Sequence, residues 1–185
     1  RTRWGKIRMI LLASFLPLLF LAIWLCTVRM PGPDFTGPLA PLTPEQEVLR
    51  ARIERHVRAL AADIGVRSDD EYARVQRAAA YIESELRSLG YGVVSQEFDA
   101  EGRTYRNLQA TLAGTTLRHE VVVLGAHYDT AEEAPGADDN ASGVAAVLEL
   151  ARVFARTPQA RTVRFVLFPN EEPPWFATAD MGSRH

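Results

Sequence analysis

The stretch 120-EVVVLGAHYD-129 carries an apolar run into a histidine and an aspartate, and 162-TVRFVLFPNEE-172 carries a second run into two glutamates. Unbroken runs of β-branched and aromatic residues predict strands that are covered on both faces. Between them, 141-ASGVAAVLELARVFA-155 has the pattern of a helix. Strand, helix and strand in this order predict a βαβ unit, whose two strands are parallel.

Two helices are predicted on the N-terminal side of this unit. The first starts at Thr43, with Pro44 in its first turn and Gln46 at the position of a capping box. The second covers about residues 69–89, opened by Ser68 with Glu71 at the capping-box position and closed by Gly90. Apolar residues at steps of three and four along the second helix predict a face that packs on a sheet.

A hairpin completes the predicted domain. The segments 92-GVVSQEF-98 and 104-TYRNLQATLA-113 read as antiparallel strands joined through the turn residues of 99-DAEGR-103. With the βαβ unit, they predict an α/β fold. We expect a three-layer sandwich in which helices flank a mixed, largely parallel central sheet.

The N-terminal region has the character of a membrane segment. Residues 9–28 carry no charge, and about 20 apolar residues span the core of a bilayer. The basic flank 1–8 holds Arg1, Arg3, Lys6 and Arg8, against Arg29 alone on the other side, which favours a cytoplasmic N-terminus. The alternative is a cleavable signal peptide, whose apolar region is normally shorter and precedes a small-residue cleavage site. We favour an anchor or uncleaved signal.

The remaining domain boundaries follow from this assignment. A proline-rich linker covers residues 29–43, and residues 44–185 form the domain. With a cytoplasmic N-terminus, that domain lies outside the membrane, in a periplasmic or extracellular location.

Composition limits the function classes. The chain is 47% hydrophobic and 24% charged, and its formal net charge of -2 gives no reason to expect a nucleic-acid partner. The one cysteine, Cys26, lies in the apolar N-terminal segment, which excludes an intramolecular disulfide and a cysteine metal cluster. Any metal must therefore be held by His, Asp or Glu.

Polar residues of the βαβ unit converge at one edge of the predicted sheet, because parallel strands end at the same edge. These residues are His127, Asp129, Asp138, Asp139, Asn140, Glu171 and Glu172. Each has a simpler explanation when taken alone: residues 138–140 could cap the helix, His127 could be hydrogen-bonded near the core, and the glutamates could be a solvated turn. Several carboxylates at one crevice would repel one another without a cation. Imidazole with carboxylates suits zinc, or less specifically cobalt or manganese.

The adjacent pair Glu171 and Glu172 needs a break in the strand. Successive side chains on a regular strand point to opposite faces, so both can serve one site only where the strand has ended. We expect Pro173 to end it. One carboxylate can then bind a metal while its neighbour acts as a base.

At these residues the sequence resembles the zinc-dependent exopeptidases of metallopeptidase family 28. The matching stretches are "GAHYDT", "PGADDNASGVAAVLELAR" and "FVLFPNEEPP", in the family's order, and the resemblance covers roughly residues 43–185. It implies two zinc ions, with His127 a ligand of one, Glu172 a ligand of the other and Asp139 bridging them. It further implies that Asp129 orients His127, that Glu171 is the general base, and that the reaction is hydrolysis of peptides with a free N-terminus, as by an aminopeptidase.

The resemblance also sets limits and leaves alternatives. The family completes its site with a further aspartate and a histidine downstream of the double glutamate, so we expect this chain to hold the N-terminal portion of the domain, about half a site, and to be inactive or nearly so alone. One rival is a glutaminyl-cyclase-like acyltransferase with a related fold and one zinc, which "GADDNASG" and "NEE" fit less well. Another rival is a non-catalytic, receptor-like ectodomain, in which we would expect metal ligands to be missing. The ligands that the resemblance implies within residues 43–185 are present, which counts against this alternative.

Overall fold

A computed structural model describes residues 3–29, 32 and 35–185. The chain divides into two units, Arg1–Pro41 and Leu42–His185. The predictions that concern Arg1 and residues 30–31 and 33–34 of the linker lie outside the described residues.

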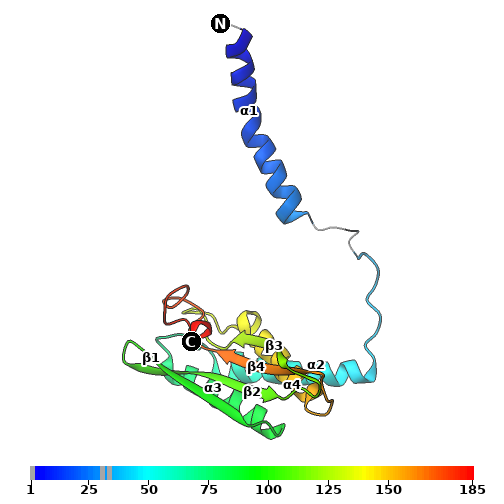
Figure 1. The fold of residues 1–185 in the computed structure, drawn as a ribbon, viewed down its shortest axis with the longest axis vertical. Helices are drawn as coiled ribbons and strands as arrows, with labels where there is room; N and C mark the ends of the chain where they lie inside the picture. The colour runs from blue at the N-terminus through cyan, green and yellow to red at the C-terminus, as the bar shows by residue number, and fades with distance from the viewer. Residues whose placement is uncertain (1–2, 30–31, 33–34) are drawn as a thin grey trace. The chain divides into compact units, whose positions relative to one another are not determined.

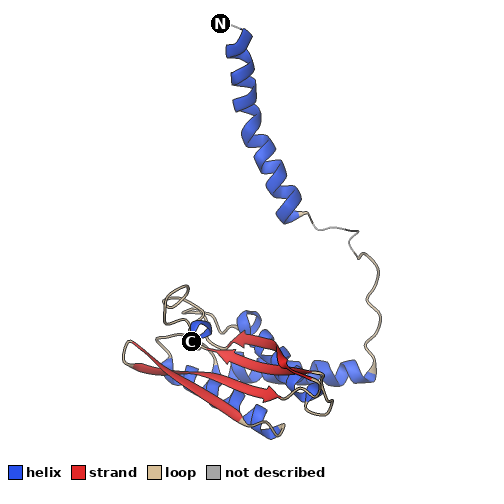
Figure 2. Cartoon of the chain, viewed as in Figure 1, coloured by secondary structure: helices blue, strands red, loops and turns tan. Residues whose placement is uncertain are grey.

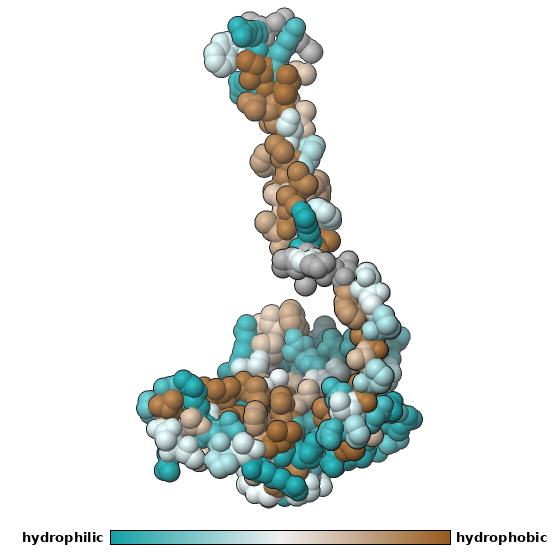
Figure 3. Space-filling model, turned by 90° about the vertical axis from the view of Figure 1, so that its right-hand side faces the viewer, coloured by the Kyte–Doolittle hydropathy of each residue, from teal (hydrophilic) through white to brown (hydrophobic). Residues whose placement is uncertain are grey.

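The first unit is mainly one apolar helix, α1 (Arg3–Ile23), which continues into η1 (Trp24–Val28). Most of these 26 residues are apolar, and none of them is buried. Apolar side chains follow one another along the helix, with hydrophilic ones at its start (Figure 3). By length and composition the helix can cross a membrane, a property that it shares with signal sequences.

The first predicted helix of the second unit has the expected start. Helix α2 (Pro44–Arg58) begins with a capping box: the Gln46 N–H donates to Thr43 Oγ1 at 3.3 Å, and the Thr43 N–H donates to Gln46 Oε1 at 2.8 Å. The helix continues as η2 (Ala59–Ile64) and ends at Gly65. The capping residues in the sequence therefore placed this start correctly.

The second predicted helix, α3 (Tyr72–Ser88), starts later than expected. The prediction of a capping box opened by Ser68 is wrong, since Glu71 is the N-cap and makes no side-chain capping bond. The reason is that residues 68–71 form a separate turn, in which the Glu71 N–H donates to Ser68 O at 3.0 Å. The predicted end is right, because Gly90 follows the helix with a φ of +90°, which favours glycine.

Four strands form one mixed sheet in the order β1-β2-β4-β3 (Figures 1 and 2). Strands β1 (Val93–Ala100) and β2 (Arg103–Leu112) are the predicted antiparallel hairpin. Strands β3 (Leu117–His127) and β4 (Arg161–Phe168) pair in parallel, and β2 pairs with β4 antiparallel. Helix α4 (Gly143–Phe154) connects β3 to β4, so the predicted βαβ unit is confirmed.

The core lies between this sheet and a layer of helices. Helix α3 packs on β1 and β2, helix α4 packs on β3 and β4, and the two helices contact each other, which puts both on one face of the sheet. Helix α2 packs on α4. The helix layer and the sheet are two of the three expected layers. The core side chains include Val75, Ile82, Leu86, Tyr105, Leu108, Val144, Leu148, Phe165 and Leu167.

Strand β3 departs from the expectation that both strands of the unit are covered on both faces. Val121, Val122 and Val123 are 43%, 41% and 57% exposed. The reason is position: β4 lies between two strands, whereas β3 is the edge strand of the described sheet and pairs with β4 alone. In β4, by contrast, most of the apolar side chains are buried.

Replacing Phe165 by alanine tests the two-layer core. This side chain is fully buried on β4, between the rings of Tyr91 and Phe154. We expect Phe165→Ala to lower the free energy of unfolding by about 3–5 kcal/mol, because it leaves a cavity. Phe176→Ala, at a side chain that is 60% exposed, should leave it nearly unchanged. Denaturant unfolding of both variants in detergent checks this, and equal losses would contradict the placement of the core.

Candidate metal centre

The ends of β3 and β4 lie level with each other at one edge of the sheet. His127, the last residue of β3, is paired in register with Phe168, the last residue of β4. One residue further on, the Tyr128 N–H donates to Phe168 O at 2.8 Å. The segments that follow the two strands therefore leave the sheet side by side, and they carry Asp129 on one side and Glu171 and Glu172 on the other.

The imidazole of His127 lies among carboxylates. Its Nε2 is 2.9 Å from Asp139 Oδ1 and 3.8 Å from Glu171 Oε2. Its Nδ1 is 3.3 Å from Asp129 Oδ1. The side chain is 11% exposed. Both ring nitrogens thus face acidic groups: Nε2 faces the loop before α4 and the segment after β4, and Nδ1 faces the segment after β3.

Asp129 connects the two strand ends through its two oxygens. Its Oδ1 faces His127, and its Oδ2 accepts the backbone N–H of Glu172 at 2.9 Å. The residue is only 5% exposed. A buried carboxylate with both oxygens engaged holds its neighbours in fixed orientations, which suits a residue that orients a ligand more than one that binds a metal itself.

In the loop before α4, Asn140 caps the helix and Asp139 faces the candidate site. The Gly143 N–H donates to Asn140 Oδ1 at 2.9 Å, so Asn140 occupies the capping position that we considered for residues 138–140. Asp139 has non-helical backbone angles, φ -111° and ψ 96°, within η3 (Ala137–Ser142). Its side chain faces His127 and is 73% exposed. Asp138 uses its backbone carbonyl, which accepts from Ser142 Oγ at 2.6 Å.

Glu171 and Glu172 reach the same place from the end of β4. One ligand atom from each of His127, Glu171 and Glu172 lies within 4.8 Å of the other two. The prediction that Pro173 ends the strand is wrong, because β4 already ends at Phe168. Pro169 has no N–H to continue the ladder, and Asn170 turns the chain with a φ of +61°. The Asn170 side chain is buried and donates to Asp180 O at 3.2 Å.

Negative charge is in excess at this edge. Burial alone would lower the pKa of His127, but the hydrogen bond and charge of Asp129, with Glu171 and Asp139, raise it to about 9. Burial and then the charge of Asp139 raise the pKa of Glu172. Among the residues that the structure describes, no Arg or Lys forms a salt bridge with Asp129, Asp139, Glu171 or Glu172. The site therefore offers one imidazole nitrogen and several carboxylate oxygens that are not paired with a cationic side chain. Such a set of atoms fits a divalent cation such as zinc.

Two residues near the site, Asn170 and Arg67, were not singled out from the sequence for the roles that they have. Asn170 is of a residue type that favours left-handed turns, so its position directly after a strand was a usable signal. Arg67 is different. It lies in a loop between two helices, far from the site in sequence, and only the fold shows that its side chain is fully buried beneath the site loops.

The comparison with known families fits this geometry. Residues 107–185 match "Peptidase family M28". The matched region contains the ends of β3 and β4 and the loop before α4, and so includes every candidate site residue.

Two bacterial proteins are similar to this chain over part of their length. The "Uncharacterized protein YfbL" of Escherichia coli (strain K12) is 37% identical over 140 residues, which are 71% of this chain and 43% of that protein. "Aminopeptidase YwaD" of Bacillus subtilis (strain 168) is 37% identical over 71 residues, 38% of this chain and 16% of that protein. The chain thus matches less than half the length of either relative.

Solved structures of two kinds share the fold. A Zn-dependent exopeptidase from Parabacteroides distasonis has a TM-score of 0.55 and 25% identity, covering 72% of this chain and 51% of that one. The glutaminyl cyclase of Fimbriiglobus ruber also has a TM-score of 0.55, with 27% identity over 78% of this chain and 50% of that one. The α/β fold is therefore that of zinc exopeptidases and of glutaminyl cyclases alike.

Asp129→Asn tests the link between the strand ends. An amide can accept at only one of its two positions, so it cannot accept from both His127 Nδ1–H and the Glu172 N–H. We expect the zinc affinity of the purified chain to fall roughly 10- to 100-fold, the range typical for loss of a residue that orients a ligand. The control is Asp70→Asn, at an exposed aspartate before α3. Competition against a chromophoric chelator measures both, and an unchanged affinity in Asp129→Asn would remove Asp129 from the site.

Proposed function

We propose that this chain is part of a membrane-anchored zinc exopeptidase that removes residues from the N-terminus of peptides. The observation that carries the proposal is the surroundings of His127 at the end of β3. Its Nε2 lies 2.9 Å from Asp139 Oδ1, and one ligand atom from each of His127, Glu171 and Glu172 lies within 4.8 Å of the other two. The match of residues 107–185 to peptidase family M28 and the similarity to aminopeptidase YwaD support it.

In this proposal His127, Asp139 and Glu172 would hold zinc, and of the two ions expected in the complete site Asp139 would serve both. When bound, zinc polarises the carbonyl of the substrate and lowers the pKa of a water molecule. Asp129 accepts a hydrogen bond from His127 Nδ1–H, so that Nε2, which faces Asp139 and Glu171, would be the nitrogen that binds the metal. The donor set has a nitrogen and several oxygens without sulfur, as hydrolytic zinc sites commonly do.

Glu171 is the proposed general base. Its side chain is 37% exposed, and its Oε2 lies 3.8 Å from His127 Nε2. It can therefore take a proton from the attacking water and then pass it to the amine that leaves, so that one carboxylate serves both halves of the hydrolysis. The backbone N–H of Glu172 is held by Asp129, which fixes the start of the two-glutamate segment relative to His127.

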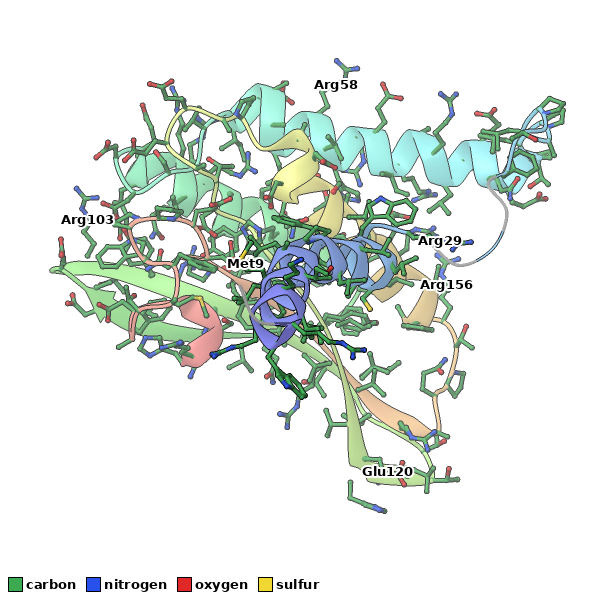
Figure 4. All side chains as sticks on the ribbon, turned by 90° about the horizontal axis from the view of Figure 1, so that it is seen from above. Met9, Arg29, Arg58, Arg103, Glu120 and Arg156 are labelled. Atoms are coloured by element: carbon green, nitrogen blue, oxygen red, sulfur yellow. The ribbon has the colours of Figure 1, made fainter. Side chains whose placement is uncertain are left out.

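Glu171→Gln separates catalysis from metal binding. In the protein as the cell makes it, purified from membranes, we expect hydrolysis of a leucyl anilide to depend on zinc, to stop with a chelator and to return with added zinc. Glu171→Gln should lower kcat by roughly 10²- to 10⁴-fold, the contribution typical of a general base, with an unchanged zinc content. Glu120→Gln is the matched control, because Glu120 lies near the opposite end of β3 (Figure 4). Full activity of Glu171→Gln would contradict the assignment.

The solved glutaminyl cyclases favour a second candidate, cyclisation of an N-terminal glutamine. The same protein can be given a glutaminyl peptide and a leucyl anilide in parallel. We expect hydrolysis of the anilide, with no release of ammonia from the glutaminyl peptide. Ammonia release without anilide hydrolysis would favour the cyclase, and zinc binding without either reaction would favour a receptor-like ectodomain.

The helix Arg3–Val28 is the proposed membrane anchor. Arg3, Lys6 and Arg8 precede its apolar stretch, so we propose a cytoplasmic N-terminus and a periplasmic or extracellular domain. We expect the protein to stay in the membrane fraction after an alkaline carbonate wash, and protease added outside to digest the domain. Loss of residues 1–28 should release it. A mature protein whose N-terminus lies after Val28 would instead identify the helix as a cleaved signal.

A further inference from the structure

Arg67 is a buried cation whose guanidinium donates all of its hydrogen bonds to backbone carbonyls. Its side chain lies in the loop between η2 and α3 and is 0% exposed. The Nε–H donates to Tyr128 O at 2.7 Å, Nη2 donates to Gly136 O at 3.1 Å, and Nη1 donates to the carbonyl oxygens of Leu60, Gly65 and Pro135, each at 2.9 Å.

These five acceptors belong to three separate segments of the chain. Leu60 lies in the first turn of η2 and Gly65 follows its end, Tyr128 follows β3, and Pro135 and Gly136 precede η3. Tyr128 stands between His127 and Asp129, whereas Gly136 leads into the loop that carries Asp139. The guanidinium of Arg67 therefore connects the segment that carries His127 to the loop that carries Asp139.

The backbone of Arg67 strengthens the same connection. Its N–H donates to Thr130 Oγ1 at 2.9 Å, and its carbonyl accepts the Thr130 N–H at 3.2 Å. Thr130 is 1% exposed. The segment after β3 is thus held at both its backbone and its side chain, on either side of Asp129.

The loop around the guanidinium leaves no free space. A Cβ added at Gly136 would lie 2.3 Å from Thr130 Cγ2, 2.5 Å from Asp139 O and 3.0 Å from Arg67 Nη2. The φ of Gly136 is +58°, which also favours glycine. A side chain at position 136 would therefore collide with Thr130, Asp139 and Arg67, so glycine is needed where these three residues come together.

Only arginine has the donors that this position uses. Its planar group carries five N–H donors in a fixed fork, whereas lysine has three donors on one atom. Burial lowers the pKa of Arg67 to about 10, and the charge of Asp129 offsets part of that effect, so the side chain is charged at neutral pH. The carbonyl oxygens compensate its loss of hydration.

We propose that Arg67 is a positioning residue, which sets the distance between His127 and Asp139 and thereby the affinity of the site for zinc. This inference rests on the proposed function, because it takes His127 and Asp139 as zinc ligands. Arg67 itself touches neither the metal nor the substrate; it acts through the backbone at Tyr128, Pro135 and Gly136.

Zinc titration of the chain of residues 1–185 in detergent tests the proposal. Arg67→Met removes the donors at similar length, and we expect it to weaken zinc binding roughly 10- to 100-fold. Arg67→Lys keeps the charge and some donors, so its zinc affinity should lie between that of the unchanged chain and that of Arg67→Met. Arg58→Met is the matched control, since Arg58 projects from α2 into solvent (Figure 4), is 67% exposed and pairs only with Glu54 among the described residues; it should bind zinc like the unchanged chain.

A second comparison separates positioning from general loss of stability. Ile82→Ala removes a fully buried side chain from α3 and should lower the free energy of unfolding by about 2–5 kcal/mol without changing zinc affinity where the chain is folded. Hydrogen exchange in metal-free protein supplies a readout that does not need zinc. Arg67→Met and Arg67→Lys should speed exchange of the Thr130 and Ala141 amides, which donate to Arg67 O and Gly136 O.

The outcomes distinguish this inference from the proposed function. Faster exchange at Thr130 and Ala141 together with weaker zinc binding supports it, and if Arg67→Met does not fold, Arg67→Lys decides alone. Wild-type exchange and wild-type zinc affinity in a folded Arg67 variant overturn it. If the unchanged chain does not bind zinc, the proposed function fails, and with it the zinc role of Arg67, whatever the exchange experiment shows.

Discussion

The parallel pairing of β3 with β4 in a fixed register is the constraint on which the candidate site depends. His127 and Phe168 lie opposite each other as the last residues of their strands, so the acidic segments that follow them start level. Helix α4 closes the crossover between the two strands, and the loop before it brings Asp139 to the same edge. A shift of this register by one residue would turn His127 to the other face of the sheet and separate it from Asp139 and Glu171.

The site that results is held by hydrogen bonds but is not neutral in charge. Asp129 accepts hydrogen bonds from His127 Nδ1–H and from the Glu172 N–H. The Arg67 side chain donates to Tyr128 O and Gly136 O, and so connects the segment after β3 to the loop before α4. Four carboxylates and one imidazole then lie close together, and burial and the neighbouring charge keep the pKa of Glu172 above its ordinary value. A divalent cation at the centre explains this excess of negative charge, because the cation offsets the repulsion between the carboxylates that the fold brings together.

The sequence predicted the elements that depend on local pattern. The capping box at Thr43, the stop at Gly90, the hairpin and the βαβ unit follow from short-range chemistry. The arrival of His127, Asp139 and Glu171 at one edge then follows from the parallel arrangement of the two strands. Features set by long-range packing could not be predicted in this way. Ser68 does not cap α3 because its segment forms a turn of its own, β3 is exposed because it lies at an edge, and Arg67 has no local pattern that distinguishes it from a solvated arginine.

Zinc itself, located by anomalous diffraction at its absorption edge in crystals of the protein, gives the most direct test of the central claim. We expect a peak between His127, Asp139 and Glu172, with nitrogen and oxygen ligands at about 2.0–2.2 Å and Asp129 behind the imidazole. A zinc ion bound only elsewhere, for instance at the buried pair of His56 and Glu149, whose Nε2 and Oε1 lie 3.3 Å apart, would contradict it.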